Sequence, residues 1–371
     1  MGADGPLVGI LGGGQLARLL AQAGEKLGVR CRVLDPNPEC SAGRVCEQVV
    51  GAYDDADALG RLADGCDVVT YEFENVPVES AEWVAQRVPV HPTPGALRVA
   101  QDRLNERELF AQLGVAMPGF VPIDSEHQIA PALTRVGEPA LLKARRLGYD
   151  GKGQFLVSGA HDAPAAWRAI GGAPAILDAF VPFERELSVV AVRARDGECR
   201  FYPPAQNVHR GGILRLTRAP APGVPAGLRE RAESAARAIM DHLGYVGVMA
   251  VEFFQTGEGA DATLLANEIA PRVHNTGHWT IEGAPASQFE NHLRAVLGME
   301  LGETAGSVAS AMVNAIGELP DPVRVASVPG AVLHDYEKAP RPGRKVGHVT
   351  ITACSPAELS ARLEHYTRVV G

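Results

Sequence analysis

The sequence has no cysteine pair at metal-binding spacing, no long apolar run and no excess of positive charge. Its six cysteines form no C-x-x-C motif, so we expect scattered thiols in a reducing compartment rather than a zinc site. No apolar run approaches the roughly 20 residues of a membrane span, and the start "MGADGPLVGILGGG" lacks the features of a signal peptide. The formal charge of −9 argues against nucleic-acid binding, which requires a basic face. We therefore expect a cytoplasmic protein that binds neither nucleic acid nor membrane.

Size and composition indicate an ordinary globular protein with more than one domain. The 371 residues exceed the usual size of a single hydrophobic core, which favours two or three domains. Hydrophobic residues make up 46% and charged residues 21% of the chain, as in typical globular proteins. A small anion is still a possible ligand, because local basic clusters can bind one whatever the net charge.

The first hundred residues alternate between strand and helix patterns. The strand "LVGIL" is followed by the glycine turn "GGGQ" and the helical segment "LARLLAQAGEKLG", and further strands are expected in "VRCRVLD" and "CDVVTYEFE". Alternation at this spacing predicts a parallel sheet with helices on its faces. A polar amphipathic helix at 101–114 is expected to connect this unit to the next.

The rest of the chain has the pattern of an α+β protein. Short strands are expected in "PALLKA", "QFLVS" and "AILDAFV". The segment "RELSVVAVRARDGECRFYP" predicts a hairpin that turns at Asp196 and Gly197. A long helix is expected at 226–243, followed by a second hairpin in "GVMAVEFFQTGEGADATLLANEIA".

The first glycine motif, "GILGGGQLA", fits the dinucleotide-binding pattern G-x-G-x-x-A. It follows a strand, and Asp35 lies about 20 residues further on, as in such fingerprints. The physical basis is broader, because backbone N–H groups at a helix N-terminus can hold any phosphate. The motif alone therefore indicates an anion site without identifying the ligand.

A second glycine-rich segment, "LLKARRLGYDGKGQF" (141–155), places Lys143 at the end of a strand. Its spacing is not that of a Walker A loop. A glycine loop beside a lysine on a strand can nevertheless cover a triphosphate, with Lys143 on the α and β phosphates. The alternative is a surface hairpin turn.

The second hairpin contains two glutamates that are candidates for a metal site. If its turn lies near Gly259 and Ala260, Glu252 and Glu268 stand opposite each other on one face. Opposed carboxylates repel, so a cation is expected between them, and oxygen ligands suit Mg²⁺ bound to nucleotide phosphates. A solvated pair of glutamates is the alternative, which the apolar flanks disfavour.

The segment "NEIAPRVHNTGHWT" (267–280) brings Glu268, Arg272, His274 and His278 close together in sequence. A zinc site, a hydrolytic triad and an anion pocket are all possible. The histidine spacing is that of H-E-x-x-H, but Asn275 stands in place of the glutamate and glycine disfavours a helix. No nucleophile motif G-x-S-x-G occurs in the chain. The anion pocket is therefore favoured.

In combination and in order, these motifs resemble the ATP-grasp superfamily. More narrowly, "GGGQL", "YEFENV", "GYDGKGQ", "NVHRGGIL", "NEIAPRVHNTGHWT" and "RPGRKVGH" look like the N5-carboxyaminoimidazole ribonucleotide synthetase family of bacterial purine biosynthesis. The resemblance implies an ATP-grasp fold of mixed α/β and α+β class. It also implies a Rossmann-like pre-ATP-grasp domain at 1–103, a central lid domain at 104–184, and a larger C-terminal domain at 185–371 with a small terminal β region.

The resemblance implies an ATP-dependent ligase with ATP and Mg²⁺ as cofactors. Glu252 and Glu268 would bind the metal, and Glu186 would hold the ribose hydroxyls. The family usually has glutamate where Asp178 stands. The implied nucleotide-binding positions are Arg103, Lys143, Gly148, Tyr149, Asp150, Gly151, Lys152, Gly153, Gln154, Asp178, Ala179, Phe180, Val181, Glu186, His209, Asn267 and Glu268.

The resemblance further implies bicarbonate and 5-aminoimidazole ribonucleotide as substrates. Arg272 and His274 would hold bicarbonate or carboxyphosphate, and with Lys143 they would form the catalytic set. Carboxylating relatives have asparagine where Ala270 stands. The implied substrate contacts are Gly14, Gln15, Leu16, Glu74, Tyr149, Asp150, Arg272, His274, Lys338, Arg344 and Lys345. A homodimer is expected from the same resemblance.

Three other functions can be compared with this one. A formate-dependent glycinamide ribonucleotide transformylase would share the ATP-grasp architecture, but "NEIAPRVHNTGHWT" favours the carboxylating family. An NAD-dependent oxidoreductase would rest on the first glycine motif alone. A non-catalytic nucleotide-binding module would need degenerate carboxylates, whereas Glu252 and Glu268 are both present.

Overall fold

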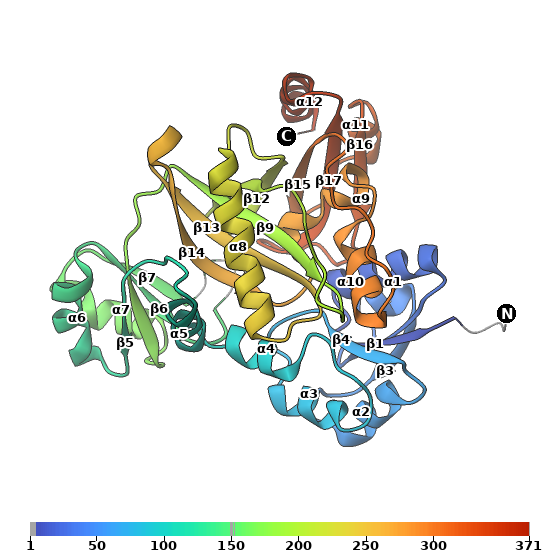
Figure 1. Cartoon of the computed structure of the whole chain (residues 1–371), viewed down its shortest axis with the longest axis horizontal. Coiled ribbons are helices and arrows are strands. Elements are labelled where there is room, and N and C mark those ends of the chain that lie inside the picture. Colours follow the sequence, from blue (N-terminus) through green and yellow to red (C-terminus); the bar gives the residue numbers. More distant parts are fainter. Residues whose placement is uncertain (1–4, 149–150, 152, 371) are drawn as a thin grey trace.

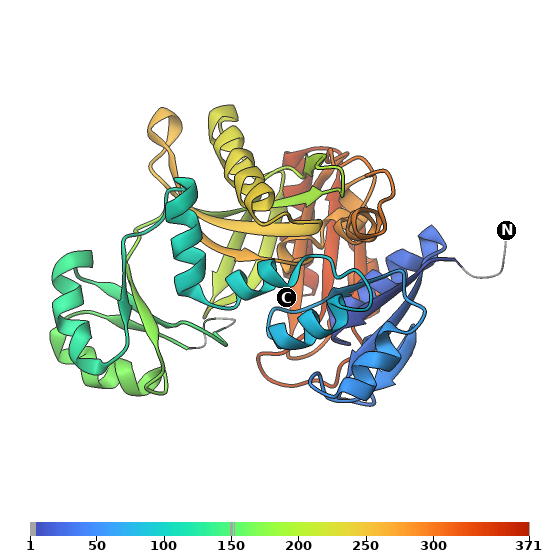
Figure 2. The ribbon, with the colours of Figure 1, turned by 60° about the horizontal axis from the view of Figure 1, so that its bottom comes forward.

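Three β-sheets organise the chain, of which the computed structural model describes residues 5–148, 151 and 153–370. The N-terminal sheet and the small central sheet lie at opposite ends of the molecule, and the largest sheet lies between and above them (Figure 1). A second view shows the same separation of the two smaller sheets (Figure 2). Within the described ranges, no helix is both long enough and apolar enough to cross a membrane.

The N-terminal sheet is parallel, in the order β3-β2-β1-β4, as the alternating pattern predicts. Its strands are β1 (Leu7–Leu11), β2 (Arg30–Asp35), β3 (Glu47–Val50) and β4 (Val68–Tyr71). Its helices are α1 (Gln15–Leu27), α2 (Ala56–Ala63), α3 (Val78–Ala85) and α4 (Pro94–Ala100). Strand β3 was not predicted, because it is a short edge strand in which only Val49 is buried.

The central sheet is antiparallel, in the order β5-β8-β6-β7. Its strands are β5 (Phe120–Ile123), β6 (Ala140–Ala144), β7 (Gln154–Val157) and β8 (Ala175–Ala179), with helices α6 (Ile129–Val136) and α7 (Ala163–Ala169). Helix α5 (Arg103–Leu113) precedes this sheet and confirms the predicted connecting helix.

The largest sheet has nine strands and holds most of the candidate site. Its strands are β9 (Arg185–Arg193), β10 (Cys199–Phe201), β11 (Ala205–Arg210), β12 (Ile213–Ala219), β13 (Gly247–Thr256), β14 (Thr263–Ala270), β15 (Ala309–Ile316), β16 (Ala331–Asp335) and β17 (Lys345–Ala353). Its helices are α8 (Ala226–His242), α9 (Thr280–Gly283), α10 (Gln288–Leu297), α11 (Pro322–Ala326) and α12 (Pro356–Val369). Both predicted hairpins form, as the β9–β10 and β13–β14 pairings.

The terminal strands continue the large sheet, because β12 pairs with β15 and β15 pairs with β17. The small terminal β region expected within the C-terminal domain is therefore hydrogen-bonded to the preceding strands of the large sheet. The division of the chain at residues 103 and 184 stays a prediction.

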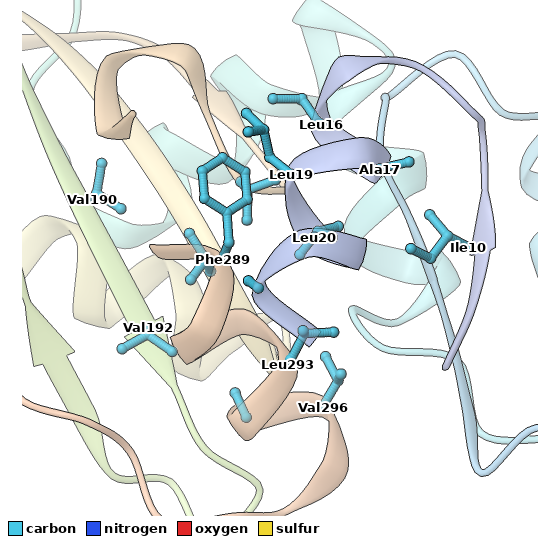
Figure 3. Packing of buried hydrophobic residues seen from close by; sticks show 14 of the residues in the cluster. Ile10, Leu16, Ala17, Leu19, Leu20, Val190, Val192, Phe289, Leu293 and Val296 are labelled. Atoms are coloured by element: carbon cyan, nitrogen blue, oxygen red, sulfur yellow. The ribbon is translucent and has the colours of Figure 1, made fainter. Parts of the chain in front are cut away.

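The N-terminal domain is fastened to the large sheet by an apolar contact between helices α1 and α10. Leu16, Leu19 and Leu20 of α1 pack with Phe289 and Leu293 of α10 in one buried cluster (Figure 3). The cluster extends to strand β9, whose inner face it covers. Burial of such side chains is the main favourable contribution to folding, so these two parts of the chain share a hydrophobic core.

Candidate active site

The two candidate metal ligands lie opposite each other on the β13–β14 hairpin. The register pairs Glu252 with Glu268, which confirms the predicted position. Nearer the turn, Phe253 pairs with Ala266, so Asn267 is the extra residue of a β-bulge. The strand pairs next to the turn are centred between Gly259 and Ala260, as predicted, and the bulge shifts the register by one residue so that Glu252 faces Glu268 rather than Asn267.

The two carboxylates differ in their surroundings. Burial, and then the charge of Glu268, raises the pKa of the Glu252 carboxyl above its ordinary value. Burial would also raise the pKa of Glu268, but Arg103 and Lys143 outweigh it and the pKa is lowered. Arg103 Nη1 lies 3.1 Å from Glu268 Oε2. The site therefore holds one stable carboxylate beside one that favours protonation until a cation arrives.

Lys143 on β6 forms a buried ion pair with Asp178 on the neighbouring strand β8. The Lys143 Nζ to Asp178 Oδ2 distance is 2.9 Å, and Nζ lies 3.5 Å from Asn267 Oδ1. Burial lowers the pKa of Lys143 despite the opposing effect of Asp178. The lysine is thus held near the glutamate hairpin, where it can reach an anionic ligand.

A second group of predicted nucleotide contacts lies on the neighbouring strands β9 and β11 and at the end of β8. Glu186 on β9 and His209 on β11 are joined by a hydrogen bond of 2.7 Å between Oε2 and Nδ1. Burial would lower the pKa of His209, but the bond to Glu186 outweighs it and the pKa is raised. Ala179 ends β8, and Phe180, which follows it, is 48% exposed. The exposed ring and the paired polar groups are available to a ligand.

The predicted glycine loop approaches the turn between β11 and β12. A Cβ on Gly151 would lie 2.9 Å from Gly212 Cα, and Gly151 has a φ of +76°. Only glycine combines this conformation with so close an approach. Gly148, Gly153 and Gln154 lie in the described part of the same segment. The predicted contacts Tyr149, Asp150 and Lys152 fall outside the described residues.

Arg272 and Glu74 form a partly buried ion pair that connects the segment after β14 to the N-terminal domain. The guanidinium Nε donates to Glu74 Oε2. Burial would raise the pKa of Glu74, but Arg272 outweighs it and lowers the pKa to about 2. The resemblance assigned these residues to two different substrates, and the structure brings them into direct contact.

His274 lies beside this ion pair as a neutral imidazole. Burial, and then the charge of Arg272, lowers its pKa well below the ordinary value. Its Nδ1 lies 3.8 Å from Glu252 Oε1 and has no hydrogen-bond partner among the described residues. Arg272, Glu252 and His274 therefore surround one small polar region.

The structure does not support a zinc site at His274 and His278. His278 is fully buried, and its Nδ1 lies 3.2 Å from the amide nitrogen of Gln288. Its ring also packs against His348, with centroids 4.9 Å apart. In the described ranges, no group of three or more histidine, cysteine or acidic side chains could hold a metal ion. His278 is a packing residue.

The first glycine turn was predicted to hold an anionic ligand, and the structure places a carboxylate of the protein itself against it. The backbone N–H groups of Gly14 and Ala17 donate to the carboxylate of Glu72, at 2.9 and 3.3 Å. A Cβ on Gly14 would lie 2.5 Å from that carboxylate, which explains the glycine. The N–H group of Gly14, one of the predicted contacts, therefore donates to the protein itself. Among the described residues, the N–H groups of Gln15 and Leu16 have no such partner.

The basic segment at 338–345, which follows strand β16, lies against this turn. Lys338 Nζ donates to Gln15 Oε1, and Lys338 and Arg344 line a cavity of about 300 Å³ together with Gly14. Burial lowers the pKa of Lys338 to about 8, although Glu72 opposes the shift. Lys345, at the start of β17, is close enough to lower the pKa of both Glu252 and His274. Gly14, Lys338 and Arg344 thus line one cavity, and Lys345 lies near Glu252 and His274.

Comparison with known proteins decides the family. Residues 6–101 match the ribonucleotide synthetase preATP-grasp domain, 108–289 the ATP-grasp domain, and 310–362 the phosphoribosylaminoimidazole carboxylase C-terminal domain. The N5-carboxyaminoimidazole ribonucleotide synthase of Pseudomonas aeruginosa is 48% identical over 96% of this chain and 97% of its own length. The chain belongs to the N5-carboxyaminoimidazole ribonucleotide synthase family. The predicted ATP-grasp fold and ligase class are thereby confirmed.

Solved structures of N5-carboxyaminoimidazole ribonucleotide synthases agree with this assignment. The synthetase from Thermus thermophilus has a TM-score of 0.93 and 55% identity, covering 98% of each chain. The synthase from Aspergillus clavatus, solved in complex with ADP and 5-aminoimidazole ribonucleotide, has a TM-score of 0.92 and 32% identity over 99% of each chain.

Sequence reasoning missed three residues of the site. Glu72 caps helix α1, and Glu106 and Arg107 are buried beside the glutamate hairpin at 2% and 0% exposure. Glu72 could have been noticed, because it directly follows an apolar strand and precedes the predicted contact Glu74 by two residues. Glu106 and Arg107 gave no signal, since their helix has the polar pattern of an exposed connector.

Proposed function

We propose that this protein carboxylates 5-aminoimidazole ribonucleotide to N5-carboxyaminoimidazole ribonucleotide, using ATP and bicarbonate. The observation that carries the proposal is that the nucleotide-binding candidates and an anion pocket lie side by side, with Glu252 Oε1 3.8 Å from His274 Nδ1. The glutamate hairpin and Lys143 suit a nucleotide, and Arg272, His274 and Glu74 form an anion pocket beside them. The names of the relatives fit this arrangement.

The chemistry divides into two steps. A bicarbonate oxygen attacks the γ-phosphorus of ATP, which gives carboxyphosphate and ADP. The exocyclic amine of the nucleotide then attacks the carboxyl carbon, and phosphate leaves as the amine loses a proton. The first step is needed because bicarbonate has no leaving group. Water must be excluded, since it would hydrolyse the intermediate.

The nucleotide side of the site has matching groups for ATP. Lys143 and Arg103 supply positive charge for the phosphates, and charge preorganised in a dry site lowers the barrier to phosphoryl transfer. Glu186, hydrogen-bonded to His209, can accept from the ribose hydroxyls. Asp178 is 2% exposed and its Oδ1 has no partner among the described residues. We assign that oxygen to the adenine amino group.

Glu252 and Glu268 fit a magnesium ion chemically. Both offer oxygen atoms, the ligand type that Mg²⁺ prefers, and nucleotide phosphates commonly complete its coordination. A divalent cation would also offset the effects of burial and of the Glu268 charge, which together raise the pKa of Glu252. When bound, the metal would neutralise charge on the phosphate oxygens.

We assign the bicarbonate to the pocket of Arg272 and His274. Arg272 is held by Glu74 and keeps its charge, because the neighbouring carboxylate outweighs burial and raises its pKa. His274 is a weak base at its lowered pKa, so its role is to hold the anion as a neutral hydrogen-bonding group. The phosphate of the acceptor nucleotide is assigned to Lys338, Arg344 and Lys345, near the free N–H groups of Gln15 and Leu16.

The test is the release of ADP by purified protein with Mg-ATP, with and without bicarbonate and 5-aminoimidazole ribonucleotide. We expect turnover that requires both and falls about 100-fold or more in Arg272→Ala. Turnover with formate and glycinamide ribonucleotide would instead assign the protein to the transformylases. Absence of ATP turnover under every condition would contradict both. A homodimer and a cytoplasmic location stay predictions.

A further inference from the structure

Helix α5 holds the backbone on both sides of the metal-ligand candidate Glu268. Arg107 Nη1 donates to the carbonyl oxygen of Asn267 at 2.7 Å, and Glu106 Oε1 accepts from the N–H of Ile269 at 2.6 Å. Asn267 is the bulged residue of β14, where the regular ladder is interrupted. Two neighbouring side chains of α5 thus bind the β14 backbone directly before and after Glu268, beside the bulge.

The other terminal nitrogen of the Arg107 guanidinium contacts the central sheet. Arg107 Nη2 lies 3.0 Å from Asp178 Oδ2, the same oxygen that binds Lys143 Nζ at 2.9 Å. One guanidinium therefore joins the glutamate hairpin to the carboxylate that holds the phosphate-binding lysine. The planar guanidinium allows this, because its two terminal nitrogens can each donate to a different acceptor.

This network is not explained by stability alone. Arg107 is 0% exposed, and Glu106 and Asp178 are each 2% exposed. Buried ion pairs lose hydration, and replacing a complete buried pair with apolar side chains is often neutral or favourable. A geometric role accounts better for these three ionisable side chains, since their hydrogen-bond partners are the backbone and side chains of the site itself.

We propose that Arg107 is a positioning residue, which holds Glu268 and Lys143 at the spacing required by a metal-bound nucleoside triphosphate. The inference rests on the roles proposed for those two residues. Arg107 does not contact the acceptor nucleotide in this assignment. Its loss should therefore affect the two substrates differently.

The experiment compares Arg107→Met, Arg107→Lys and a control, Arg193→Met. Arg193 is also held by a carboxylate and a carbonyl, Asp241 Oδ1 and Tyr245 O, both at 2.9 Å, but it lies on β9 away from the site. For each variant we would measure kcat, KM for Mg-ATP, KM for 5-aminoimidazole ribonucleotide and the Mg²⁺ concentration at half-maximal activity.

We expect Arg107→Met to raise KM for Mg-ATP about 10-fold or more, to raise the Mg²⁺ requirement, and to leave KM for the acceptor within about 2-fold. Arg107→Lys should lose less than Arg107→Met, because one ammonium can replace only some of the hydrogen bonds of the guanidinium. Arg193→Met should change neither KM. If Arg107→Met does not fold, the same split between substrates is read from Arg107→Lys.

An unchanged KM for Mg-ATP and Mg²⁺ requirement in folded Arg107→Met would overturn the proposal. An equal loss for both substrates, shared by Arg193→Met, would also overturn it by showing a general structural effect. Failure of the proposed function is distinguishable, since the unmodified protein would then show no ATP turnover that requires both bicarbonate and 5-aminoimidazole ribonucleotide.

Discussion

Glu72 places its carboxylate at the N-terminus of helix α1, 2.9 Å from the N–H of Gly14. In dinucleotide-binding proteins with the same glycine spacing, a pyrophosphate is bound at this end of the helix. Here the carboxyl group of Glu72, which belongs to the protein itself, lies at this positive end of the helix. Glu72 accepts from the N–H groups of Gly14 and Ala17, which are then not available to a pyrophosphate, and this disfavours the alternative of an NAD-dependent oxidoreductase.

Removing the Glu72 side chain should destabilise the fold. Glu72→Ala leaves two buried N–H groups without an acceptor, so we expect a loss of about 1–3 kcal/mol in the free energy of unfolding. Glu72→Gln should cost much less, because its amide oxygen can still accept and burial already disfavours the charge, as the raised pKa of Glu72 indicates. Urea unfolding of the two variants measures the difference, and equal losses would contradict the capping role.

The raised pKa of Glu252 predicts competition between protons and magnesium. In the free enzyme Glu252 stays protonated to a higher pH than an exposed glutamate, so metal binding must displace a proton. The Mg²⁺ concentration needed for half-maximal activity should therefore fall as the pH rises from about 6 to about 8. In Glu252→Gln this dependence should disappear together with most of the activity. A metal requirement independent of pH in the unmodified enzyme would argue against the assignment.

Lys338 should limit substrate capture at high pH. Its pKa is lowered to about 8, so its positive charge is lost as the pH rises through that value. We expect kcat/KM for 5-aminoimidazole ribonucleotide to decline above about pH 8, since this parameter reports groups of the free enzyme. Lys338→Arg should remove the decline, because arginine stays charged. A decline that persists unchanged in this variant would have to come from another group.

The contact between α1 and α10 should couple the unfolding of the N-terminal domain to that of the large sheet. Leu293 is fully buried in the shared cluster, and we expect Leu293→Ala to cost about 2–5 kcal/mol in the free energy of unfolding. The matched control is Val323→Ala on α11, where the side chain is 77% exposed and a change within about 0.5 kcal/mol is expected. Similar values for both variants would show that the cluster contributes little.

The parts of the fold that follow a regular pattern were predictable from the sequence. The two hairpins, the parallel sheet and helix α5 each correspond to a periodicity or a turn signal in the chain. The pairing of Glu252 with Glu268 was also predicted, although the assumed symmetry contained no bulge. The bulge at Asn267 could not be foreseen, because it depends on Glu106 and Arg107, which come from a distant helix.

The site residues that were missed are those whose burial contradicts their local pattern. Glu106 and Arg107 lie on a helix that is polar on most of its surface, and only tertiary packing turns them inward. The glycine motif was ambiguous for a related reason. Its spacing specifies the conformation of the turn, whereas the group that fills the helix N-terminus is Glu72, which directly follows strand β4.

The continuous sheet from β14 to β16 has a consequence for substrate selection. Under the proposed roles, the metal carboxylates lie on β13 and β14 at one edge of this sheet, and Lys345 begins β17 near the other edge (Figure 1). Lys345 is nevertheless close enough to lower the pKa of both Glu252 and His274, so the sheet curves and brings its two ends toward each other. Because hydrogen-bonded strands hold both ends, the gap between them is fixed, and an acceptor of a different size would contact only one of them.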